Sequence, residues 1–228
     1  MKEATGTSGH CLSGSQNGKL EVLMIGESTF AGVGVKTHQE GFTGAFTEQL
    51  SRCFDKDIHW KVYARSGYTA KRVVYKILPK IEEKKTDIIM IGLGGNDAFH
   101  LTTPRKWRQD VTFLVASLQK QFPSTPLVFC NLPPIKLFPV FPFTIKFVVG
   151  NLVEILGEEL ELLVNQWDNV FFNSDVVTIA SWKEKFKIKG DINDFFSDGL
   201  HPSQLTYQVW GKEMANVTAE RFLPRLSE

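Results

Sequence analysis

The chain has 228 residues, enough for one domain with a large core. Apolar residues make up 43% and charged residues 22%, which is ordinary for a soluble globular protein. The 26 basic and 25 acidic residues balance, so the overall charge gives no argument for nucleic acid or an anionic membrane as a partner.

Residues 1–18 are rich in Gly, Ser and Thr and contain no apolar run, so we do not expect them to be a secretory signal. We expect them to be disordered and to precede a single domain over residues 19–228, in a cytoplasmic protein. The three cysteines, Cys11, Cys53 and Cys130, are odd in number and widely spaced, which favours neither a disulfide framework nor a metal site.

Five apolar, β-rich runs alternate with longer helical patterns. The predicted strands cover residues 20–26, 58–65, 87–93, 126–131 and 169–173, and the predicted helices cover 41–54, 69–81, 105–122, 144–166 and 203–226. The first, third and fourth strands are almost continuously apolar, as parallel strands covered on both faces are. The pattern predicts a three-layer α/β/α sandwich with a five-stranded parallel sheet in flavodoxin-like order. Ligands bind such sheets at the carboxyl ends of the strands.

Ser28 directly follows the first strand, in the tripeptide Gly26-Glu27-Ser28. Gly26 permits a sharp turn that would expose the serine hydroxyl at the rim of the sheet. A serine in this place is alternatively a turn or N-cap residue. The segment is neither a P-loop nor the Gly-x-Ser-x-Gly elbow, because Phe30 replaces the second glycine of that elbow.

Asp198 and His201 lie three residues apart, just before the last predicted helix. This spacing allows the aspartate to hold His Nδ1, leaving Nε2 to take a proton from Ser28. The alternative is an aspartate that caps a loop beside a surface histidine. Among the other histidines, only His100 competes for the role of base.

Two more blocks also follow predicted strands: Gly67, and Asn96 within Gly94-Gly95-Asn96-Asp97. The Asn96 amide and the Gly67 N–H could donate to an oxyanion. Both blocks are alternatively glycine-rich turns.

In their order and spacing, these four blocks resemble those of the SGNH (GDSL-like) hydrolase superfamily, named for its Ser, Gly, Asn and His. The resemblance runs from Leu20 to about Trp210. It implies a serine esterase without metal or organic cofactor, in which Ser28 is the nucleophile, His201 the base and Asp198 the third member of the triad. It also implies an oxyanion hole formed by the N–H groups of Ser28 and Gly67 and the side chain of Asn96.

The chain departs from the family pattern at Glu27, where the family usually has aspartate. That aspartate normally supports the site loop and is not the triad carboxylate, so we expect activity to survive. Thr29 replaces the usual leucine, which we expect to matter little.

Residues 132–143 form an apolar insert with four prolines and three phenylalanines, Phe138, Phe141 and Phe143. Proline prevents a regular helix there. The insert is interpreted as an acyl-binding wall or lid, as a dimer or membrane-surface contact, or as a loop folded onto the core.

These observations predict a serine esterase that acts on a small-molecule acyl ester, such as a simple acyl ester or a lysophospholipid-like lipid. The alternatives are a sugar or thioester deacylase at the same site, and a non-catalytic ligand-binding or interaction domain of the same fold. Neither the acyl chain length nor the oligomeric state follows from the sequence.

Overall fold

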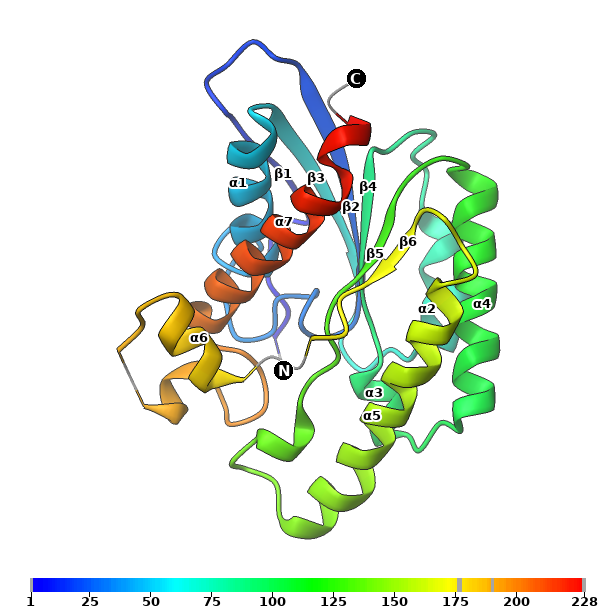
Figure 1. Cartoon of the computed structure of the whole chain (residues 1–228), viewed down its shortest axis with the longest axis vertical. Coiled ribbons are helices and arrows are strands. Elements are labelled where there is room, and N and C mark those ends of the chain that lie inside the picture. Colours follow the sequence, from blue (N-terminus) through cyan, green and yellow to red (C-terminus); the bar gives the residue numbers. More distant parts are fainter. Residues whose placement is uncertain (1, 176–177, 190, 227–228) are drawn as a thin grey trace.

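A computed structural model describes residues 2–175, 178–189 and 191–226 of the chain. Within them, six strands form one sheet in the order β1-β3-β2-β4-β5-β6 (Figure 1). The strands are β1 (Ser8–Cys11), β2 (Lys19–Gly26), β3 (Asp57–Ala64), β4 (Ile88–Gly92), β5 (Leu127–Phe129) and β6 (Val170–Phe172). Strands β2 to β6 are parallel, and their order is flavodoxin-like, as predicted.

The prediction of disorder over residues 1–18 was wrong for the described part, and the sheet has one more strand than expected. Strand β1 pairs antiparallel with β3, with Ser8 opposite Lys61 and Cys11 opposite Ile58. Ala4 is buried, and its N–H donates to the carbonyl of Ala31 at 2.9 Å. This order comes from pairing with distant segments, which the polar composition of the N-terminus does not reveal.

Two long helices, α1 (Phe42–Phe54) and α7 (Gln204–Leu226), cover one face of the sheet (Figure 1). Their apolar side chains pack against alternate strand residues such as Val22 and Met24. On this side, Phe46, Leu50 and Tyr207 are completely or almost completely buried.

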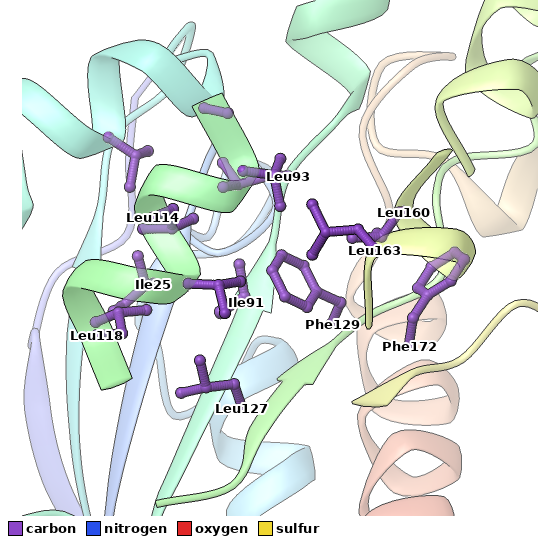
Figure 2. Packing of buried hydrophobic residues seen from close by; sticks show 14 of the residues in the cluster. Ile25, Ile91, Leu93, Leu114, Leu118, Leu127, Phe129, Leu160, Leu163 and Phe172 are labelled. Carbon is purple, nitrogen blue, oxygen red and sulfur yellow. The ribbon is translucent and has the colours of Figure 1, made fainter. Parts of the chain in front are cut away.

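The other face is covered by α2 (Ala70–Lys76), α4 (Pro104–Gln121) and α5 (Phe143–Val164). Figure 2 shows this layer, where Leu114 and Leu118 of α4 and Leu160 of α5 face side chains from the central strands. The strand residues point to alternate faces, so Leu23 and Ile25 lie in this layer while their neighbours lie in the first. Burial of both faces explains why these strands read as continuous apolar runs.

The predicted helices match the long helices within about two residues, with one exception. The helix expected over 69–81 ends at Lys76 and is followed by a 3₁₀ turn, η1 (Leu78–Lys80), because Pro79 has no N–H to continue it. Four short elements were not expected: α3 (Gly95–Phe99), α6 (Ile179–Lys185), and the 3₁₀ turns η2 (Ile135–Leu137) and η3 (Ile192–Phe195). Among the described residues, no helix has the length and apolarity to cross a membrane.

Candidate active site

Ser28 lies at the carboxyl end of β2, beyond the point where Gly26 pairs with Gly92 of β4. The Glu27 N–H donates to the Gly92 carbonyl at 3.0 Å, and the Val33 N–H donates to the Ser28 carbonyl at 3.1 Å. The buried ring of Phe30 fills the space above both glycines. A Cβ on Gly26 would lie 2.6 Å from the Gly92 carbonyl oxygen, so the turn that presents Ser28 requires glycine here.

Asp198 and His201 form the contact expected from their spacing. The Nδ1 atom of His201 lies 3.0 Å from an Asp198 carboxylate oxygen, and the other oxygen accepts the His201 N–H at 2.7 Å and the Leu200 N–H at 3.0 Å. Partial burial opposes ionisation of Asp198, but these hydrogen bonds outweigh it and hold the carboxyl pKa below its usual value. The aspartate therefore stays ionised and fixes the ring so that Nε2 is the nitrogen left for proton transfer.

The loop that carries His201 is anchored at both ends. The Ser197 N–H donates to the His201 carbonyl at 2.8 Å, and the Ser203 hydroxyl donates to the Asp194 carbonyl at 2.6 Å. Ser203 also accepts the Thr206 N–H at 3.3 Å in the first turn of α7. The imidazole is thus placed by a loop that is tied to the start of α7.

Glu27 is buried, and its side chain supports the loop that carries Asn96. Its two carboxylate oxygens accept the N–H groups of Gly95 and Asn96, both at 2.9 Å. Burial raises the pKa of Glu27 to about 8, the nearby Asp97 adds to this, and the two N–H donors oppose it. Glu27 therefore reaches the site loop despite its extra methylene.

Asn96 links the two predicted oxyanion loops, since its side-chain amide donates to the Tyr68 carbonyl at 3.2 Å. Gly67, next to Tyr68, has a φ of +77°, a backbone conformation that favours glycine. Gly67 does not line the cavity described next, so its placement rests on this link to Asn96.

Ser28, Asn96 and His201 line one cavity, although they come from distant parts of the chain. Within the described residues the Ser28 hydroxyl makes no hydrogen bond, so the pair with His201 is not closed in this structure. Most of the other lining side chains are apolar: Leu93, Phe99, Leu132, Pro133, Pro134, Ile135, Leu137, Phe138, Ile179, Trp182, Phe195, Phe196, Leu200, Pro202 and Trp210. Nowhere among the described residues are three His, Cys, Asp or Glu side chains arranged to hold a metal ion.

The apolar insert contributes only one of its three phenylalanines to the cavity. Phe138 lines it, whereas Phe141 packs beside Phe138 and Phe99, and Phe143 is 78% exposed on the first turn of α5. The prediction that Phe141 and Phe143 line an acyl pocket is therefore not met. The insert turns into η2 and then α5, which carries Phe143 away from the cavity.

The sequence analysis missed five lining aromatics: Phe99, Trp182, Phe195, Phe196 and Trp210. Trp182 lies on α6, which is fixed to α7 by a hydrogen bond from its indole N–H to Glu213 at 2.6 Å. Phe195 and Phe196 lie just before the Asp198 block, and this proximity in the sequence could have indicated that they line the site.

The family model of the GDSL-like lipase/acylhydrolase family matches residues 24–209, which include Ser28, Asn96, Asp198 and His201. The chain belongs to this family. It is a serine hydrolase of the acyl-hydrolase type, and the resemblance drawn from the four blocks is confirmed.

Solved structures of low sequence identity share the fold of this GDSL-like hydrolase. TesA is 16% identical with a TM-score of 0.62, over 90% of this chain and 98% of its own. The esterase EstA from Pseudoalteromonas sp. is 18% identical with a TM-score of 0.59, over 90% and 99%. A family 3 carbohydrate esterase from Clostridium thermocellum is 16% identical with a TM-score of 0.61, over 91% and 97%. The search of curated proteins finds no match.

Proposed function

We propose that the protein hydrolyses carboxylic esters with an apolar acyl group, through Ser28, His201 and Asp198. One observation carries the proposal: Ser28, Asn96 and His201 open into a single apolar cavity, while Asp198 holds His201 from behind. Membership of the family indicates acyl-hydrolase chemistry, and residues of this chain can be assigned to each step of that chemistry.

The reaction follows from the atoms in place. Ser28 Oγ attacks the acyl carbon as His201 Nε2 takes the hydroxyl proton, and the carbonyl electrons move onto oxygen. The Ser28 N–H, the Gly67 N–H and the Asn96 amide stabilise this oxyanion. Collapse breaks the C–O bond, and His201 returns the proton to the departing alcohol. Water then attacks the acyl carbon as His201 takes a proton from it. The bond between the acyl carbon and Ser28 Oγ breaks, His201 returns the proton to Oγ, and the acid leaves.

The lining of the cavity favours an alkyl acyl chain over a sugar acetate. A site for a sugar needs polar groups that satisfy the ring hydroxyls, and burying such hydroxyls without partners is costly. Here Leu93, Leu132, Ile135 and Phe138 present mainly carbon to the cavity.

The test is hydrolysis of a chromogenic ester series, from acetate to long acyl chains, by wild type and Ser28→Ala. We expect wild-type turnover that increases beyond acetate, and a loss in the variant of at least about 10³-fold, because the nucleophile is removed. The control is Thr29→Ser, which changes the neighbouring residue and leaves Ser28 in place. Equal turnover by wild type and Ser28→Ala would refute the assignment.

A further inference from the structure

The balanced overall charge hides a strongly basic region. Residues 61–85 contain eight Lys and Arg residues and two acidic ones. The N-terminal part of α4 joins α2 to form a groove whose lining includes Lys71, Arg72, Lys76, His100 and Lys106. These residues come from α2, from the start of α4 and from the segment between α3 and α4, at the same end of the sheet as the candidate active site (Figure 1).

Three of the four Lys and Arg side chains that line the groove have no carboxylate partner among the described residues. The groove contains two acidic residues, Asp97 and Asp110, and both are buried. Asp110 pairs with Lys106, and Asp97 accepts the Ala70 N–H at 2.9 Å. Within the described residues, Lys71, Arg72 and Lys76 are exposed and form no ion pair. The groove therefore keeps a surplus of positive charge.

An apolar surface lies at the same end of the molecule, and one of its side chains, Leu137, also lines the cavity. It consists of exposed side chains of the insert and of the first two turns of α5, which we call the apolar rim: Leu137 (45% exposed), Val140 (51%), Phe143 (78%), Phe147 (60%) and Val148 (51%). The rings of Phe143 and Phe147 stack on each other at 5.9 Å. Exposed apolar side chains gathered in this way mark an interaction surface.

The segment between α3 and α4 joins the rim to the groove. Phe99 lines the cavity and contacts Phe141 of the insert, and the next residue, His100, lines the basic groove. Leu101 follows, 58% exposed and with a φ of +52°. A leucine rarely adopts this left-handed backbone conformation. Leu101 thus combines a strained backbone with an exposed apolar side chain, directly after the residues that line the cavity and the groove.

We propose that this end of the molecule docks on the surface of an anionic lipid aggregate. The apolar rim enters the acyl region, and Lys71, Arg72 and Lys76 face the anionic headgroups. A second copy of the chain fits less well, because burying the rim symmetrically would bring two uncompensated basic grooves close together. A small soluble anion would occupy the groove but leave the rim exposed. The cavity with Ser28 would then open toward the lipid.

Binding is tested without hydrolysis by using Ser28→Ala in a flotation assay with two kinds of vesicle. One kind is phosphatidylcholine alone, and the other also contains phosphatidylglycerol. We expect at least about tenfold stronger binding to the anionic vesicles at low salt, and a loss of this preference at high salt. The readout does not depend on the proposed ester chemistry, so the two proposals fail separately.

Two double variants in the same background test the two surfaces. We expect Lys71→Glu/Arg72→Glu and Phe143→Ser/Phe147→Ser each to weaken binding to anionic vesicles about tenfold or more. The matched controls are Lys120→Glu and Leu162→Ser, which change exposed residues toward the other ends of α4 and α5. These should bind like the parent. Far-UV circular dichroism melting establishes that each variant is folded.

Four results would overturn the proposal. They are no binding to either vesicle, equal binding to both, equal loss in the control variants, or abolition of vesicle binding by low concentrations of glycerol phosphate. Concentration-dependent dimerisation that Phe143→Ser/Phe147→Ser removes, without vesicle binding, would assign the rim to a second copy instead.

Discussion

Glu27 combines burial with two direct contacts to the loop that carries Asn96. Burial works against its ionised form, while two N–H donors at 2.9 Å favour that form. Burial prevails, so the pKa lies near 8 rather than near the ordinary value of 4.5. Between pH 4.5 and pH 8, the Glu27 carboxyl therefore holds a proton in the folded state and has lost it in the unfolded chain.

This difference makes the free energy of unfolding depend on pH. Because the folded-state pKa is raised, the contribution of Glu27 to the free energy of unfolding is complete below pH 4.5. It declines as pH rises toward 8, by up to about 1.4 kcal/mol per pH unit. We expect Glu27→Gln to remove this decline. Urea unfolding of both proteins at several pH values between these limits measures it. Exposed Glu82→Gln is the control, and identical pH profiles for wild type and Glu27→Gln would contradict the account.

The site residues were predictable where the chemistry constrains local sequence. Asp198 and His201 meet within one short loop, so their spacing was sufficient to place them. For Glu27, the resemblance implied only that the residue supports the site loop. Its partners Gly95 and Asn96 lie almost 70 positions away, so the sequence did not identify them. Its burial and raised pKa depend on that distant loop and could not follow from the tripeptide.

At the scale of elements, the N-terminal segment contributes more than an edge strand. Glu3 accepts the Ser66 N–H at 2.8 Å and pairs with Arg65 at 3.0 Å. Ser66 directly precedes Gly67, whose N–H is a proposed oxyanion donor. The segment therefore holds one of the loops on which the proposed chemistry depends.

We expect Glu3→Ala to lower kcat for a soluble short-chain ester about tenfold, with a smaller effect on KM, because the Ser66 N–H loses a charged acceptor. Glu3→Gln keeps an oxygen for that N–H and should retain most of the activity. The measurement is steady-state kinetics, in which kcat and KM of the two variants are compared with those of wild type. If Glu3→Ala keeps the wild-type kcat, the contact serves only to fix the N-terminal segment.

The sequence predicted the central strands and long helices because their apolar patterns are long and regular. It missed β1, since Ser8–Cys11 has no apolar alternation and is ordered by pairing with β3. It missed α3 because Gly94 and Gly95 indicated a turn, and such short helices depend on tertiary contacts such as that of Glu27.

At the scale of the whole molecule, the cavity is built from segments that are far apart in the sequence. The Ser28 turn, α3, the insert, α6 and the His201 loop all contribute to it. Apolar composition left open whether the insert lines the cavity, and it did not indicate which of its side chains do so. That depends on where η2 and α5 begin, and those limits are set by packing.

Phe138 and Phe143 provide a matched test of this arrangement. We expect Phe138→Ala to lower kcat/KM for medium-chain esters about tenfold, because an apolar wall of the cavity is lost, while acetate hydrolysis changes little. Phe143→Ala, outside the cavity, should leave the chain-length profile of soluble esters unchanged. The ester series compared across the three proteins measures both effects, and a shifted profile in Phe143→Ala would show that the cavity is wrongly delimited.

The insert and the His201 loop also touch each other. The rings of Phe138 and Phe196 meet edge to face at 4.9 Å, and a Cβ on Gly199, whose φ is +84°, would lie 3.3 Å from Val140. The segment proposed to contact the acyl chain and the loop that carries the proposed base, His201, therefore share a surface. Anyone grafting a new acyl specificity onto this scaffold should exchange residues 132–143 and 195–201 together, as one cassette.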